Sequence, residues 1–213
     1  METDKLIEML ARQAGPVERG AVGRRYGAAL AAGAAGALLL MLAFLGIRPD
    51  LAQVARDPMF WVKLALPLAL LAAALAAAMR LARPGARVGY AAEAALLPVA
   101  GIWALAAAAL YSAAPGERMA LVLGSTWSVC PFNIAMLSVP AFAAAFWAMR
   151  GLAPTRPAVA GAFSGLLAGS VGAAAYCLHC PEMAPPFLGT WYLLGMAIPA
   201  VAGALAGPRL LRW

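Results

Sequence analysis

Six long runs of apolar residues alternate with short polar segments along this chain. The runs cover about residues 27–47, 64–79, 94–111, 128–149, 157–176 and 187–206. Each is long enough to cross the hydrocarbon core of a bilayer as an α-helix. We therefore predict an all-α fold, a polytopic membrane protein in which residues 27–213 form a six-transmembrane-helix bundle.

Residues 1–26 are polar and precede the first run, so they form a separate segment. Within them the stretch from Asp4 to Ala14 has helical periodicity, because Leu6, Ile7 and Leu10 recur at spacings of three and four. A helix of this length is marginal alone in water and needs a surface to lie against. That surface is the membrane surface, the helix bundle or a groove on a cytoplasmic partner.

The composition excludes an ordinary soluble domain. The chain is 64% hydrophobic and only 12% charged, with a mean hydropathy of +0.82. The net charge of +7 is spread over several polar segments, which argues against direct binding of nucleic acid. The apolar runs lack charged residues near their centres, which argues against an ion or metal transporter. Common catalytic motifs are absent from the sequence, so we predict neither an enzyme nor an obligatory cofactor.

The distribution of basic residues predicts the orientation. Twelve of the 16 lysines and arginines lie in the N-terminal segment, in the second and fourth connections and in the C-terminal tail. The remaining four lie in the first and third connections: Arg48, Arg56, Lys63 and Arg118. The positive-inside rule then places both termini in the cytoplasm.

Reactive side chains gather on the opposite, outer side. Two of the three cysteines and the only histidine lie in the motif Cys177-Leu178-His179-Cys180, and Glu182 follows closely. A CxxC pair is typical of a redox dithiol or of half a soft-metal site, and it also occurs as a structural disulfide. Cys130 begins the fourth run on the same side, next to Pro131. In a Gram-negative cell this side faces the oxidising periplasm.

The fifth run carries a glycine at every fourth position, which favours close contact with a neighbouring helix. These residues are Gly161, Gly165 and Gly169. If the fourth helix is that neighbour, the contact would bring Cys130 towards Cys180.

The sequence resembles the NrsF-like integral membrane anti-sigma factors of proteobacteria over essentially its whole length. The resemblance rests on several short motifs combined with the six spans. They are Thr3-Asp4-Lys5-Leu6-Ile7, Cys130-Pro131, His179-Cys180-Pro181-Glu182 and Trp191-Tyr192. It implies that the protein lies in a bacterial inner membrane and that residues 1–26 are a cytoplasmic sigma-binding segment for an extracytoplasmic-function sigma factor. The partner-binding residues would be Asp4, Lys5, Leu6, Ile7 and Leu10.

The resemblance also implies that outer-face cysteines sense metal or oxidant and trigger release of the sigma factor. Cys130 and Cys180 are similar to that sensing pair, and Cys177 is an addition, which leaves a Cys177–Cys180 bridge as a competing arrangement. A transient heavy-metal ion would be held by Cys130, Cys180 and His179, with Glu182 in reach. The alternative function is a membrane thiol-disulfide oxidoreductase that uses Cys177 and Cys180. Such enzymes generally relay electrons between two cysteine pairs, and three cysteines cannot form two pairs.

Overall fold

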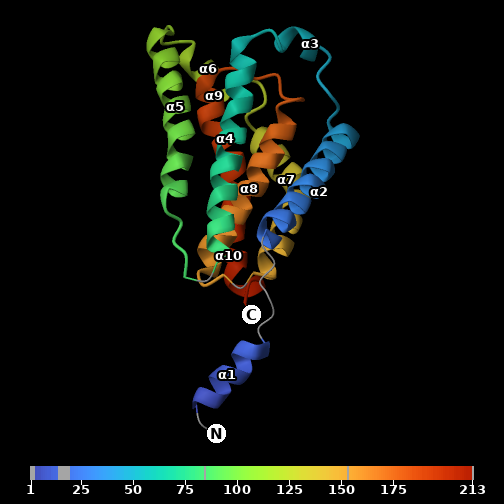
Figure 1. Cartoon of the computed structure of the whole chain (residues 1–213). Coiled ribbons are helices and arrows are strands. Elements are labelled where there is room, and N and C mark those ends of the chain that lie inside the picture. Colours follow the sequence, from blue (N-terminus) through green and yellow to red (C-terminus); the bar gives the residue numbers. More distant parts are fainter. Residues whose placement is uncertain (1–2, 14–19, 84, 153, 213) are drawn as a thin grey trace.

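The computed structural model describes residues 3–13, 20–83, 85–152 and 154–212. Within these ranges every regular element is helical, and six helices are long and apolar enough to cross a membrane. The predicted all-α, six-helix membrane bundle is thereby confirmed (Figure 1).

The six membrane-spanning segments run alternately up and down the bundle. They are α2 (Ala21–Phe44), α4 (Pro58–Leu81), α5 (Tyr90–Ser112), α7 (Cys130–Arg150), α8 (Pro157–Tyr176), and a last segment made of α9 (Pro185–Phe187), the π-helical turn η1 (Leu188–Tyr192) and α10 (Leu193–Leu210). Two short helices, α3 (Leu51–Val54) and α6 (Arg118–Leu123), lie in connections at one end, which we call the cysteine end.

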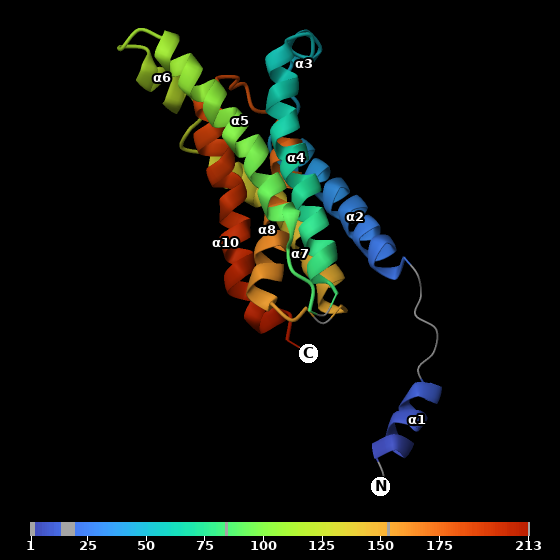
Figure 2. The same ribbon diagram turned by 60° about the vertical axis from the view of Figure 1, so that its left-hand side comes forward.

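The N-terminal helix α1 (Thr3–Gln13) lies beyond the other end of the bundle, which we call the terminal end (Figures 1 and 2). Its bounds agree with the periodicity of the sequence, and Ala14, the last residue of the predicted helix, lies outside the described residues. The chain resumes at Gly20 and leads directly into α2.

The start of α4 differs from the prediction, and the difference changes the position of Lys63. The second span was expected to begin near Leu64, but α4 begins at Pro58. The Asp57 carboxylate accepts a hydrogen bond from the backbone N–H of Met59 at 2.8 Å, and proline is favourable in the first turn. Lys63, expected in a connection, therefore lies inside α4, and its side chain is fully buried.

Helix α8 is the centre of the bundle and packs against α10, α7, α4 and α2. Its regularly spaced glycines, Gly161, Gly165 and Gly169, face α10. The expected neighbour on that side, α7, is therefore wrong. A Cβ atom on Gly165 would collide with the carbonyl oxygen of Pro199. Helix α7 approaches α8 at a different glycine, because a Cβ on Gly172 would lie 2.7 Å from the Ile134 carbonyl oxygen.

Candidate functional site

The connection between α8 and α9 folds back over the cysteine end. Backbone hydrogen bonds from Cys177 to Ala173 and from Cys180 to Tyr176, at 3.1 and 2.9 Å, add one turn after α8. Pro181 follows at once and has no N–H to continue that pattern. The turn therefore ends with Cys180 directed into the bundle, where it is fully buried.

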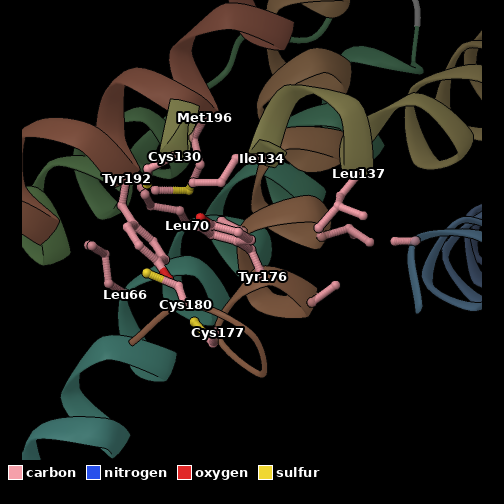
Figure 3. Packing of buried hydrophobic residues seen from close by; sticks show 14 of the residues in the cluster. Leu66, Leu70, Cys130, Ile134, Leu137, Tyr176, Cys177, Cys180, Tyr192 and Met196 are labelled. Atoms are coloured by element: carbon pink, nitrogen blue, oxygen red, sulfur yellow. The ribbon is translucent and has the colours of Figure 1, made fainter. Parts of the chain in front are cut away.

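All three thiols are free and have no exposed surface. They belong to a single cluster of buried residues (Figure 3). Cys130 is the first residue of α7, and its side chain interacts directly with that of Cys180. The Cys177 sulfur instead contacts the backbone carbonyl of Lys63 at 3.8 Å. The structure thus brings Cys130 and Cys180 together and gives Cys177 a different partner.

The surroundings of Cys180 favour its thiolate form. The Cys130 side chain, then the positive charge of Lys63, the Tyr192 hydroxyl and the backbone N–H of Glu182 lower the pKa of the Cys180 thiol to about 5, although burial opposes them. Burial raises the pKa of the Cys177 thiol to about 12. Cys180 is consequently the more nucleophilic member of the CxxC motif at neutral pH.

Lys63 is the residue that the sequence did not single out. Its ammonium group donates hydrogen bonds to the carbonyl oxygens of Cys180 and Glu182, at 2.7 and 2.8 Å. It also lies 5.3 Å from the centre of the Tyr192 ring, within the range of a cation–π contact. A buried ammonium without partners would be strongly destabilising, and these contacts offset its loss of water. The sequence feature that indicates the buried position of Lys63 is Asp57-Pro58, because this pair starts α4 early enough to place Lys63 within the helix.

Tyr192 covers the site from the last membrane-spanning segment. It is the final residue of the π-helical turn, and its ring is fully buried. Figure 3 shows its hydroxyl beside the Cys180 sulfur, where it favours the thiolate form of Cys180. Extra residues in a helical turn rotate the side chains that follow, and such turns are frequent at functional sites.

His179 and Glu182 point to other partners. The Nδ1 atom of His179 lies 3.0 Å from the Gly46 carbonyl oxygen. The Glu182 carboxylate accepts hydrogen bonds from the backbone N–H and the hydroxyl of Ser125, at 2.7 and 2.6 Å. Within the described ranges, no three histidine, cysteine, aspartate or glutamate side chains form a group suited to a metal ion. The side chains of Cys130 and Cys180 therefore share one buried cluster, whereas the His179 imidazole is directed at Gly46.

Arg48 ties the first connection to the same turn. Its backbone N–H donates to the Leu178 carbonyl and its guanidinium to the Cys180 carbonyl, both at 3.1 Å. Asp50 pairs with the guanidinium at 2.7 Å, and this hydrogen bond holds the pKa of the Asp50 carboxyl below its usual value. The turn that carries Cys180 is thus contacted by the first connection, by α4 and, through Glu182, by the segment before α7.

At the terminal end, the predicted partner-binding residues lie on α1. The side chains from Thr3 to Arg12 are all exposed. The apolar residues Leu6, Ile7 and Leu10 are 39%, 59% and 59% exposed, although they form one face of the helix. An exposed ion pair between Arg12 and Glu8 lies on the polar face.

A family model described as the negative regulator of sigma F, NrsF, matches residues 10–213. The chain belongs to the NrsF family. A "Probable anti-sigma-F factor NrsF" from Azospira oryzae is 54% identical over 213 residues, covering all of both chains. The "Anti-sigma-F factor NrsF" of Caulobacter vibrioides is 42% identical over 217 residues, again covering both chains fully. No solved structure matches this chain.

The NrsF match supports part of the resemblance noted in the sequence. It covers Cys130 and the whole turn from Cys177 to Glu182, whereas most of α1 precedes residue 10. The two relatives extend over α1 as well, since they cover the entire chain. Both NrsF relatives are named as regulators, and neither printed name describes an enzyme.

Proposed function

We propose that this chain is a membrane-embedded anti-sigma factor that sequesters an extracytoplasmic-function sigma factor. In this proposal both termini lie on the cytoplasmic side of a bacterial inner membrane. Residues 1–26 bind the sigma factor, and residues 27–213 form the sensor. Oxidation of Cys130 and Cys180, or binding of a heavy-metal ion to them, releases the sigma factor.

The exposed apolar face of α1 is the observation that carries the proposal. Leu6, Ile7 and Leu10 are more than one-third exposed, and a helix of 11 residues is marginal by itself in water. Burial of this face in a groove of the sigma factor would stabilise both the helix and the complex. Asp4 and Lys5 lie at the start of the same helix and would set its orientation in that groove.

The contact between Cys130 and Cys180 supports the sensing step. One thiol begins α7 and the other follows α8, so a bond between them would join two elements that the chain links only at the terminal end. Two thiolates are also suitable ligands for a soft metal ion. Either event would change the same contact at the cysteine end.

Helix packing offers a route from this contact to α1. Helix α7 packs along α2, the helix that follows the N-terminal segment. At the terminal end Arg25 of α2 donates a hydrogen bond to the Trp147 carbonyl at 3.1 Å and lies 4.8 Å from the centre of its ring. A shift of α7 would move these contacts. A difference of a few kcal/mol in affinity between two sensor states suffices for about a hundredfold change in sigma-factor occupancy.

Co-purification of the sigma factor with the full-length protein tests the proposal. Leu10→Asp places a charge on the exposed apolar face of α1, where a partner groove would have to bury it, whereas Leu10→Met keeps the face apolar. We expect the wild type and Leu10→Met to retain the sigma factor and Leu10→Asp to lose it. Equal recovery by all three proteins, at equal levels in the membrane, would contradict the role of α1.

A further inference from the structure

We propose that Lys63 determines which cysteine forms a disulfide with Cys180. It holds the Cys180 side chain towards Cys130 and keeps the Cys177 side chain away from Cys180. It is a positioning residue, and the inference rests on the proposed function because it concerns the sensing pair. The observation behind it is that one residue of α4 contacts both cysteines of the CxxC motif through different groups.

The ammonium group of Lys63 fixes the backbone on both sides of Pro181. It donates to the carbonyl of Cys180 at 2.7 Å and to that of Glu182 at 2.8 Å. These carbonyls belong to the segment that turns Cys180 into the bundle. Two hydrogen bonds from a buried, charged donor restrict this segment more than bonds from an exposed neutral donor would. They hold it in the conformation in which the Cys180 side chain meets Cys130.

The backbone of Lys63 engages the other cysteine. The carbonyl oxygen of Lys63 lies 3.8 Å from the Cys177 sulfur, so the Cys177 thiol is directed at α4. Cys177 is also fully buried, which restricts its rotation towards Cys180. The same helical residue therefore orients the two thiols towards different partners.

Without this positioning, the short separation along the chain would favour a disulfide between Cys177 and Cys180. Cys177 and Cys180 are three residues apart, whereas Cys130 is separated from Cys180 by more than a helix pair. Short loops close at a lower entropic cost than long ones, so an unrestrained CxxC pair forms its own disulfide readily. A device that holds Cys180 towards Cys130 is needed for the longer connection to form instead.

Arg48 contributes to the same carbonyl from a different element. Its guanidinium donates to the Cys180 carbonyl at 3.1 Å, but it belongs to the first connection and also pairs with Asp50. Lys63 has the shorter contact, lies on a long helix and is fully buried. Loss of Lys63 should thus affect the position of Cys180 even when Arg48 remains.

Controlled oxidation with diamide, a two-electron thiol oxidant, tests the inference on the full-length protein in lipid nanodiscs. One thiolate adds to the N=N bond, and the second sulfur then attacks the first and displaces the hydrazine. One S–S bond forms, and the two protons and two electrons of the thiols reduce diamide to hydrazine dicarboxamide. Proteolysis and mass spectrometry then measure the ratio of Cys130–Cys180 to Cys177–Cys180 bridges.

Three variants are compared with the wild type. Lys63→Met removes the donor and keeps the length, Lys63→Arg keeps a charged donor, and Arg56→Met removes an exposed cation of the first connection. We expect the wild type and Arg56→Met to form mainly Cys130–Cys180. Lys63→Met should shift the ratio by about tenfold or more towards Cys177–Cys180, the size expected from loss of a hydrogen bond from a charged donor. Lys63→Arg should restore most of the wild-type ratio.

The outcomes separate this inference from the proposed function. An unchanged ratio in Lys63→Met overturns the role of Lys63 and leaves the sensing pair in place. A wild type that forms only Cys177–Cys180, or no bridge, overturns both this inference and the oxidative sensing step of the proposed function. If Lys63→Met fails to fold, Cys130→Ala with Lys63 intact gives the answer: slow formation of Cys177–Cys180 supports the inference, and rapid formation overturns it.

Discussion

The backbone of Gly165 in α8 lies directly against the carbonyl oxygen of Pro199 in α10. Proline at position 199 leaves the carbonyl four residues earlier without its usual helical donor, and α10 tolerates this within the membrane. The approach is so close that even a methyl group at Gly165 would require the two helices to separate. The fixed position of α8, and hence of the turn that carries Cys180, depends on this contact.

We therefore expect Gly165→Ala to destabilise the bundle by about 1–3 kcal/mol, the usual cost of overpacking. Gly101→Ala in α5 is the matched control, because nothing lies within 4 Å of the added methyl group. Thermal unfolding of both variants in detergent checks this. A melting temperature for Gly165→Ala equal to that of Gly101→Ala would show that the two helices separate without cost.

The proposed sensing step predicts that removal of the Cys130 thiol abolishes the response to oxidant. Cys130→Ser keeps the size of a buried side chain but cannot form a disulfide with Cys180. Expression of a sigma-dependent reporter should then stay low when oxidant is added, whereas Cys177→Ser should still respond. A Cys130→Ser protein that responds as the wild type does would assign sensing to another group.

The lowered pKa of Cys180 predicts a pH dependence with a definite sign. A thiol with a pKa of about 5 is a thiolate above that pH and becomes protonated as the pH falls below it. An ordinary cysteine changes at about pH 8.5. The difference in thiolate absorbance between the wild type and Cys180→Ala, measured between pH 9 and 4, should thus fall as the pH is lowered, with a midpoint near pH 5. A midpoint of 8 or higher would mean that Lys63 and Cys130 do not favour the thiolate.

Glu182 should stabilise the cysteine end through Ser125. Glu182→Ala leaves the backbone N–H of Ser125 without its carboxylate partner, at a cost of about 1–3 kcal/mol where water cannot replace it. Hydrogen exchange at residues 124–128 should increase in Glu182→Ala. The control is Glu117→Ala at the same end, because Glu117 makes no side-chain capping bond to α6. Equal exchange in both variants would show that water replaces the carboxylate.

The helical bundle was predictable because hydrophobicity determines membrane-spanning segments. The predicted fifth span, residues 157–176, coincides with α8, and α1 follows the spacing of Leu6 and Leu10. The neighbours of each helix were not predictable in the same way. Regular glycines show that α8 has a smooth face, but which helix occupies that face depends on the shape of every other helix.

The composition of the site was only partly readable from the sequence. Cysteines are conspicuous in an apolar chain, so the sequence alone identifies Cys130, Cys177 and Cys180 as candidate site residues. The sequence places Lys63 in a connection because a lysine normally avoids burial, and only its hydrogen bonds to the carbonyl groups of Cys180 and Glu182 explain its buried position. Tyr192 was noticed only as part of a motif, because a π-helical turn has no clear signature in sequence.

The complete burial of the three thiols limits how a bridge formed in the proposed sensing step would be reduced again. Folded disulfide reductases carry their attacking cysteine on a globular domain and must touch the sulfur that they reduce. A bridge between Cys130 and Cys180 would offer such an enzyme no surface. Recovery would then depend on small reductants, on opening of the cysteine end or on newly made protein. The fastest of these routes would set how long the sigma factor stays released, so the transcriptional response would outlast a brief exposure to oxidant wherever that route is slow.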